Sequence, residues 1–215
     1  MLWYQTRNSE RVMLWAVDDT LVLKWLALQL GGKLPVHERC EHRKHGGGVK
    51  ASVRRLHHAI RDEDYTFVYR TDIRGYYRHI RKPQVDTLFC RNVGEPILWN
   101  LFRQYLYYRI EDGGEIETPK VGIAWSCSLS PLVGASLLYH YDGDFGQREG
   151  IYYARYMDDF MVFAKTCWHL RRSIQRLNEY MDIGGFEVHP DKTYIDRIQH
   201  GFDLLGVYFD GTGIT

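Results

Sequence analysis

Three aspartates stand where a carboxylate is costly unless a cation accompanies it. Asp72 closes one apolar and aromatic run, YTFVYRTDI, and Asp158 and Asp159 interrupt a second, IYYARYMDDFMVFA. A carboxylate at the rim of a buried strand costs desolvation energy, and three brought together repel one another. Two Mg²⁺ ions would resolve that repulsion, because hard cations prefer carboxylate oxygens and keep positions open for phosphate oxygens. Such a pair supports in-line phosphoryl transfer that releases pyrophosphate.

Each aspartate taken alone is more typical of a cap or a turn, so the elements around them matter. Residues 65–73 predict one strand, and 151–164 predict two strands around a tight turn at Met157–Asp159. Further short strands are predicted at 186–188, 193–197 and 202–209. Helices are predicted over 20–30, where burial is expected on nearly all sides, 49–61, from Pro83 onward, 96–108, from an N-capping Ser130 to His140, and 170–181. This alternation of strands and packing helices indicates an α+β fold.

Composition places the chain among ordinary globular proteins. It has 215 residues, 28 basic and 27 acidic side chains and a net charge of +1, which argues against disorder, collagen-like repeats and a bare coiled coil. The expected organisation is one domain or two intimate subdomains. Charge is uneven, because the stretch from Arg39 to Lys82 holds twelve basic and five acidic residues. That local charge of +7 is typical either of a phosphate-binding surface or of a solvated face.

Other sequence features narrow the setting. The four cysteines include no C-x-x-C pair, and the histidines form no H-E-x-x-H array, so a zinc site is not predicted. Scattered cysteines indicate a reduced, intracellular protein. The start of the chain is polar and charged, unlike a signal peptide, and the apolar stretch 21–30 is too short to span a bilayer. We therefore expect a cytoplasmic protein with no membrane partner.

Five ordered segments resemble the motifs of reverse transcriptases. They are FVYRTDIRGYY (67–77) for the first palm motif, GIAWSCSLSPLVGASLLYHYD (122–142) for the G-x-P-Q-G segment, YMDD (156–159) for the Y-x-D-D box, GFEVHPDKTYI (185–195) for the next motif and GFDLLGVYF (201–209) for the F-L-G primer grip. GGGVKASVRRLHHAI (46–60) and RVMLWAVDD (11–19) are loosely similar to fingers segments. The resemblance is to bacterial enzymes of the group II intron and retron type.

The resemblance implies a right-hand polymerase palm, an antiparallel sheet backed by helices, with reduced helical fingers. The implied divisions are partial fingers (1–65), palm (66–82), fingers and palm helices (83–120), palm (121–200) and a primer-grip region with the thumb missing (201–215). Without a thumb, the chain would be a fragment, make short products, or rely on a structured RNA or protein to hold the duplex.

The implied activity is RNA-directed DNA polymerisation with an RNA template, a DNA or RNA primer, dNTPs and two Mg²⁺ ions, for which Mn²⁺ could substitute. Asp72, Asp158 and, less critically, Asp159 would bind the metals together with the Ile73 carbonyl, and Lys192 would neutralise or protonate the leaving pyrophosphate. The remaining implied roles are nucleotide binding by Tyr77 (the steric gate), Tyr76, Trp125, Arg11 and Lys50, primer grip by Leu205 and Gly206, and template or backbone contact by Arg54 and Arg55.

Two other functions remain open from the residues. Where the family carries G-x-P-Q-G, this chain has Ala124, Trp125 and Ser126, which favours a catalytically degenerate relative that binds structured RNA. An RNA-templated polymerase that makes RNA would share the aspartates, although the bulky Tyr77 argues against it. An unrelated acid-rich hydrolase is a remote third reading.

Overall fold

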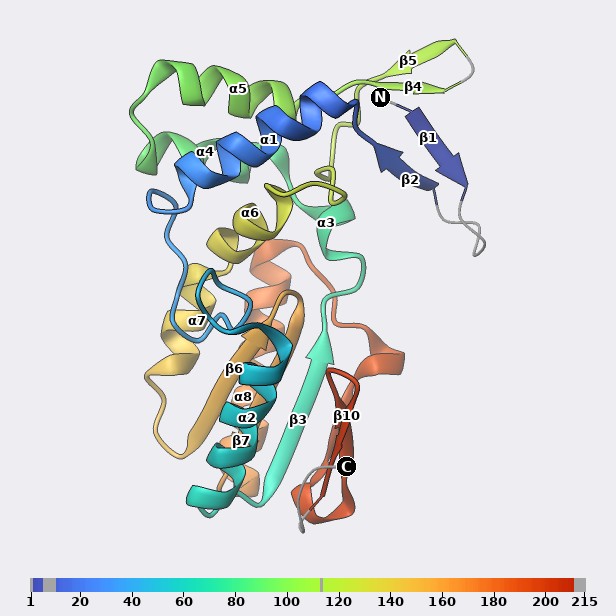
Figure 1. Ribbon diagram of the computed structural model, residues 1–215. Coiled ribbons are helices and arrows are strands. Elements are labelled where there is room, and N and C mark those ends of the chain that lie inside the picture. The colour runs from blue at the N-terminus through green and yellow to red at the C-terminus, as the bar shows by residue number, and fades with distance from the viewer. Residues whose placement is uncertain (1, 6–10, 113, 211–215) are drawn as a thin grey trace. The chain divides into compact units, whose positions relative to one another are not determined.

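The computed structural model describes residues 2–5, 11–112 and 114–210, with the side chains of 2–5, 11–13 and 112 left out. These residues form two compact units, the first from 1–36 and 77–137, the second from 37–76 and 138–215. Each unit has its own sheet and its own helices (Figure 1). No helix within the described ranges is long and apolar enough to cross a membrane.

The first unit combines a small mixed sheet with a group of helices. Its strands are ordered β2–β1–β4–β5. The bounds are Leu2–Gln5 for β1, Arg11–Leu14 for β2, Ile110–Asp112 for β4 and Glu115–Glu117 for β5. Its helices are α1 (Val17–Leu30), α4 (Lys82–Asn92), α5 (Pro96–Leu106) and α6 (Ser130–Leu137), while α3 (Tyr76–His79) begins at the unit boundary. Phe89 of α4 stacks on Phe102 of α5 at 3.9 Å between ring centroids.

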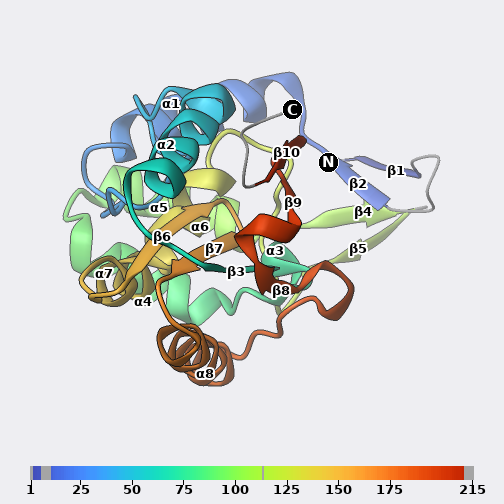
Figure 2. The same cartoon turned by 90° about the horizontal axis from the view of Figure 1, so that it is seen from below.

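The second unit is built on an antiparallel sheet whose strands are ordered β6–β7–β3–β8. The bounds are Phe67–Asp72 for β3, Ile151–Tyr156 for β6, Asp159–Ala164 for β7 and Tyr194–Arg197 for β8. Around it lie α2 (Gly48–Asp62), α7 (Tyr139–Gly146), α8 (Cys167–Gly184), the 3-10 turns η1 (Pro190–Lys192) and η2 (Ile198–His200), and the hairpin of β9 (Phe202–Leu204) and β10 (Val207–Phe209). Viewed in Figure 2, α8 covers one face of this sheet and α2 the other.

Strand register decides which side chains share a face of this sheet. In β3 and β7 the paired residues include Val68 with Phe163 and Asp72 with Asp159. Because side chains alternate along a strand, these pairs lie on one face and Thr71 with Phe160 on the other. The first face packs on α2 and the β9–β10 hairpin in one apolar cluster. The aspartates therefore lie at the end of a strand face whose Val68, Met161 and Phe163 are core, with the half-buried Arg70 next to the aspartates.

The element predictions hold with five corrections. The run 202–209 is not one strand, because a turn at Leu205 and Gly206 divides it into β9 and β10. The helix from 20 to 30 is not buried on nearly all sides, because α1 buries Leu23, Leu26 and Leu30 and exposes its other apolar residues. The helix from Ser130 breaks at 138 and continues as α7. Residues 186–188 form only one isolated bridge, from Val188 to Ile73, rather than a strand. The Ser130 hydroxyl does not cap a helix, since it donates to two carbonyls of the preceding loop.

Candidate active site

The three predicted aspartates meet at one end of the second unit's sheet. Asp72 is the last residue of β3, pairs in register with Asp159, the first residue of β7, and is 6% exposed. Asp158 lies between them in the two-residue turn that joins β6 to β7. The backbone ties the turn to β3, because the Ile73 N–H donates to the Asp158 carbonyl at 3.2 Å. Strand pairing alone therefore brings residues 86 positions apart into one site.

Two cations face these carboxylates from the same unit. The Lys192 Nζ, carried by η1, donates to Asp72 Oδ2 at 2.6 Å. The η1 turn is itself attached to the strand end, since the His189 N–H donates to the Asp72 carbonyl at 2.8 Å. On β3, Arg70 reaches Asp159 with 3.6 Å between Nη2 and Oδ1. Lys192 was predicted for this site and Arg70 was not.

Burial and neighbouring negative charge favour the protonated forms of Asp158 and Asp159. Burial raises the pKa of Asp158 to about 6, and the charges of Asp72 and Asp159 act in the same direction. Burial also raises the pKa of Asp159, against the opposing charge of Arg70. The hydrogen bond to Asp72 raises the pKa of Lys192. Crowded carboxylates of this kind favour any additional positive charge placed among them.

The donor set suits a small, hard divalent cation. Among the described residues, no three His, Cys, Asp or Glu side chains gather as a ready-made metal cluster. Mg²⁺ does not require one, because it is commonly bound by one or two protein carboxylates and completes its shell with water and substrate phosphates. Asp72 and Asp158 could supply those two carboxylates, and burial, with the neighbouring carboxylate charges, raises the pKa of Asp158.

The predicted primer-grip residues form the turn of a hairpin. Leu204 pairs with Val207, so Leu205 and Gly206 are the two central residues, with φ angles of 50° and 78°. Positive φ at both positions is the geometry of a type I′ turn, which matches the twist of antiparallel strands. Arg70 also donates to the carbonyl of Asp203 in β9. The hairpin is thus connected to the strand that carries Asp72.

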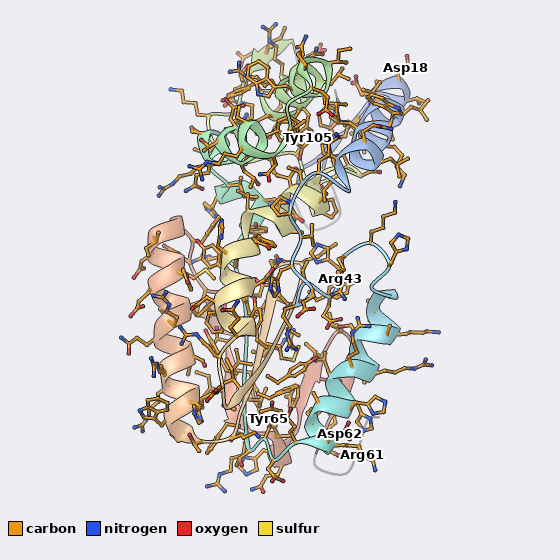
Figure 3. The ribbon with its side chains drawn as sticks, turned by 90° about the vertical axis from the view of Figure 1, so that its left-hand side faces the viewer. Asp18, Arg43, Arg61, Asp62, Tyr65 and Tyr105 are labelled. Carbon is orange, nitrogen blue, oxygen red and sulfur yellow. The ribbon has the colours of Figure 1, made fainter. Side chains whose placement is uncertain are left out.

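The predicted backbone-contacting residues of α2 separate into two kinds. Lys50 and Arg54 are exposed, and Figure 3 shows side chains projecting from α2 on the side away from the sheet. Arg55 instead forms an ion pair with the buried Glu41, 2.8 Å from Nε to Oε2, and also donates to the Gly46 carbonyl at 2.8 Å. Its guanidinium is therefore occupied by contacts within the protein.

Comparison with known proteins places this arrangement in a family. The family model described as reverse transcriptase (RNA-dependent DNA polymerase) matches residues 8–209. The chain belongs to the reverse transcriptase family. A search of curated proteins gave no match.

Solved structures share the reverse transcriptase fold at low identity. Telomerase of Candida albicans, in complex with a fragment of telomeric RNA, aligns with a TM-score of 0.60 at 14% identity, covering 89% of this chain and 36% of that one. Two apo telomerase structures of Candida tropicalis align at 0.58 and 0.60 with 13% and 12% identity, covering 92% and 90% of this chain and 44% and 39% of theirs. The chain thus spans less than half the length of each. The α+β palm fold predicted from the sequence is confirmed.

The other predicted residues of this reverse transcriptase domain are placed differently. Tyr76 belongs to the second unit, is 2% exposed and packs on Phe186 at 5.3 Å between ring centroids, so its ring is a core group. Tyr77 and Trp125 lie in the first unit, where the Tyr77 carbonyl accepts the Ile123 N–H and Trp125 is 38% exposed. The backbone of Arg11 begins β2, and its side chain lies outside the described residues.

Sequence reasoning missed a group of residues behind the aspartates: Arg70, Arg155, Asp142 and His42. A signal for two of them was present, because Arg70 and Arg155 are charged residues inside the apolar runs that become β3 and β6. A charge within a buried strand needs a partner in the fold. Asp142 and His42 carried no such signal, since Asp142 lies among other polar residues of a helix and His42 lies in a loop 115 residues before Met157.

Proposed function

We propose that this chain is an RNA-directed DNA polymerase that adds deoxynucleotides to a primer 3′-hydroxyl on an RNA template. The observation that supports this most is the meeting of Asp72, Asp158 and Lys192 at the end of a reverse transcriptase palm sheet. Charge stabilisation and positioning account for nearly all catalysis of phosphoryl transfer, so this small set of groups is sufficient in kind.

In this proposal Asp72 and Asp158, with the Ile73 carbonyl, hold two Mg²⁺ ions, for which Mn²⁺ could substitute. The bound ions would acidify the 3′-hydroxyl and stabilise the pentavalent phosphate. The hydroxyl loses its proton to solvent water as its oxygen bonds to the α-phosphorus of the dNTP, and the bond from that phosphorus to the bridging oxygen of pyrophosphate breaks. Lys192, whose Nζ lies 2.6 Å from Asp72 Oδ2, would neutralise or protonate that pyrophosphate. Asp159, paired with Arg70, would contribute charge rather than bind metal directly.

Substrate contacts are proposed from the family resemblance. Tyr77 would exclude a 2′-hydroxyl. Leu205 and Gly206 would contact the primer from the type I′ turn. The remaining proposed contacts are Tyr76, Trp125, Arg11 and Lys50 with the nucleotide, and Arg54 and Arg55 with the template. Of these, exposed Lys50 and Arg54 fit their roles better than buried Tyr76 and ion-paired Arg55.

The finer setting is proposed on the same resemblance. The motifs favour a bacterial enzyme of the group II intron or retron type acting in the cytoplasm, and the division into fingers, palm and primer-grip regions stays a prediction. The described elements include no helical thumb. Further residues of a longer chain, a structured RNA or a partner protein would then hold the primer–template duplex.

Primer extension with dNTPs on an RNA template tests the proposal. Asp158→Asn is expected to lower Mg²⁺-dependent extension by about 100-fold or more, as removal of one electrostatic stabiliser of a transition state does. The matched control is Asp62→Asn, an exposed carboxylate at the end of α2, which should extend like wild type. Equal extension by wild type and Asp158→Asn would contradict the assignment of the carboxylates.

The same assay separates the alternatives. A catalytically degenerate RNA-binding protein, favoured by Trp125 and Ser126, would bind the RNA template and extend nothing with either Mg²⁺ or Mn²⁺. A polymerase that makes RNA would extend with rNTPs in preference to dNTPs. Either result would replace the proposed function.

A further inference from the structure

Next to the turn that carries Asp158 lies a buried, bidentate ion pair. Arg155 of β6 and Asp142 of α7 are both 0% exposed at their side chains and share two hydrogen bonds, 2.5 Å from Nη2 to Oδ2 and 2.8 Å from Nε to Oδ1. The Tyr153 hydroxyl donates to the same Oδ1 at 2.7 Å. A buried pair gains little stability over apolar residues of the same volume, because desolvating both charges offsets their attraction. Stability alone is therefore a weak reason for this pair.

The remaining arm of Arg155 reaches the turn that carries Asp158. Its Nη1 donates to the Met157 carbonyl at 2.5 Å. This carbonyl belongs to the peptide group that joins Met157 to Asp158, so holding its oxygen fixes the plane from which the Asp158 side chain departs. Met157 has a φ of 55°, a left-handed conformation that costs a residue other than glycine roughly 1–3 kcal/mol. The turn requires such outside support.

A histidine holds the other peptide group of Met157. The Met157 N–H donates to His42 Nδ1 at 2.9 Å. The segment before His42 is fixed along the edge of β6, because the Arg155 N–H donates to the Arg39 carbonyl at 3.0 Å and the Glu41 N–H donates to the Arg155 carbonyl at 2.7 Å. His42 therefore reaches the turn in a set register.

We infer that Arg155, oriented by Asp142, and His42 are positioning residues that fix the Met157–Asp158 turn and aim the Asp158 carboxylate at its metal. The turn is held at three points: the Met157 N–H, the Met157 carbonyl and the Asp158 carbonyl. The first and third contacts come from outside the β6–β7 hairpin, from His42 and Ile73, and the second comes from Arg155 of β6, which Asp142 of α7 orients. This inference rests on the proposed function, since it concerns the same carboxylate.

Mn²⁺ binding, measured by electron paramagnetic resonance on the protein alone, tests the histidine without requiring turnover. His42→Leu removes the acceptor and is expected to weaken Mn²⁺ binding about tenfold, the usual effect of losing a group that orients a metal ligand. His42→Asn, whose Oδ1 occupies nearly the position of Nδ1, should restore binding to within about threefold. His58→Leu on α2 is the matched control and should bind like wild type.

A double variant tests the ion pair where a single change would leave a buried charge unpaired. Asp142→Leu with Arg155→Met replaces the pair by apolar residues of similar volume, which commonly preserves folding. We expect a folded protein with a modestly lower unfolding temperature, because the buried Tyr153 hydroxyl loses its acceptor on Asp142. Mn²⁺ binding should be about tenfold weaker, and kcat for primer extension should fall with little change in KM for dNTP. Wild-type Mn²⁺ binding and kcat in this folded variant would overturn the inference.

Asp158→Asn distinguishes failure of the proposed metal site from failure of the positioning role. If it binds Mn²⁺ as wild type does, the proposed metal site itself fails. If it loses Mn²⁺ while His42→Leu and the double variant keep full affinity, the proposed function stands and only the positioning role is wrong.

Discussion

At the scale of single residues, Lys192 offsets only part of the negative charge of the three carboxylates. Lys192 donates to Asp72, and Arg70 faces Asp159, yet Asp158 has neither cation as a direct partner among the described contacts. Burial and two neighbouring carboxylates then raise its pKa to about 6. Of the three aspartates, Asp158 is therefore expected to destabilise the metal-free protein most when it is ionised near neutral pH.

This imbalance predicts a pH-dependent stability. The native pKa of Asp158 lies above its ordinary value of 3.8, so its favourable contribution is complete below pH 4 and is lost as the pH rises through about 6. Asn resembles the protonated acid and cannot ionise. In the presence of a chelator, Asp158→Asn should exceed wild type by about 1–2 kcal/mol in unfolding free energy at pH 8, but not at pH 4.

Urea unfolding of both proteins at the two pH values measures this difference. The exposed Asp62→Asn is the control and should show no such trend. An advantage for Asp158→Asn that is the same at pH 4 and pH 8 would contradict the prediction.

At the scale of elements, periodicity predicted where helices and strands lie but not which parts of the protein pack against them. The spacing in 49–61 and the paired runs in 151–164 correctly predicted α2 and the β6–β7 hairpin, because one buried face produces the helical spacing and burial on both faces produces continuous apolar strands. The same reasoning was wrong for α1, whose Leu21 and Leu28 are 65% and 55% exposed. An apolar side chain shows that burial would be favourable, and only tertiary structure decides whether a partner is present.

The β9–β10 hairpin offers an element-scale prediction with an internal control. Gly201 and Gly206 both have a φ of 78°, so alanine at either position is strained. A Cβ on Gly206 would meet no atom within 4 Å, whereas a Cβ on Gly201 would lie 1.9 Å from the Tyr208 hydroxyl. Gly206→Ala should cost about 1 kcal/mol of unfolding free energy, and Gly201→Ala distinctly more.

Chemical denaturation of the two alanine variants measures the difference. Adding Tyr208→Phe, which removes the clashing oxygen, should recover part of the loss for Gly201→Ala and none for Gly206→Ala. Equal losses at both glycines would show that backbone strain, rather than the tyrosine, limits this hairpin.

At the scale of the whole molecule, a local charge of +7 overstates the positive surface that RNA could reach. Of the basic residues between 39 and 82, Arg70 faces Asp159, which lies outside that stretch, and Lys82 is buried over the rings of Tyr107 and Tyr108. Sequence counts charges without saying which are already compensated inside the fold. The positioning group of Asp142, Arg155 and His42 was hidden for the same reason, since its partners are far apart in the chain.

Neighbouring residues of α2 should therefore affect different properties. Lys50→Gln with Arg54→Gln removes two exposed charges and should weaken RNA binding while lowering the slope of log affinity against log salt by about 1.5. Arg55→Gln leaves Glu41, which is 4% exposed, without its partner and should cost about 1–3 kcal/mol of stability instead. Filter binding across salt concentrations and urea unfolding measure the two effects, and a salt slope unchanged by the double substitution would contradict the first.

The six-residue pairing of β3 with β7 also governs how the chain tolerates changes in its length. A deletion or insertion of one residue within either strand reverses the face of every side chain beyond it, so Asp72 would move to the face that Thr71 now occupies. The apolar cluster and the carboxylate site would be lost in one step. Within β3 and β7, insertions or deletions of an odd number of residues are therefore expected to be tolerated least.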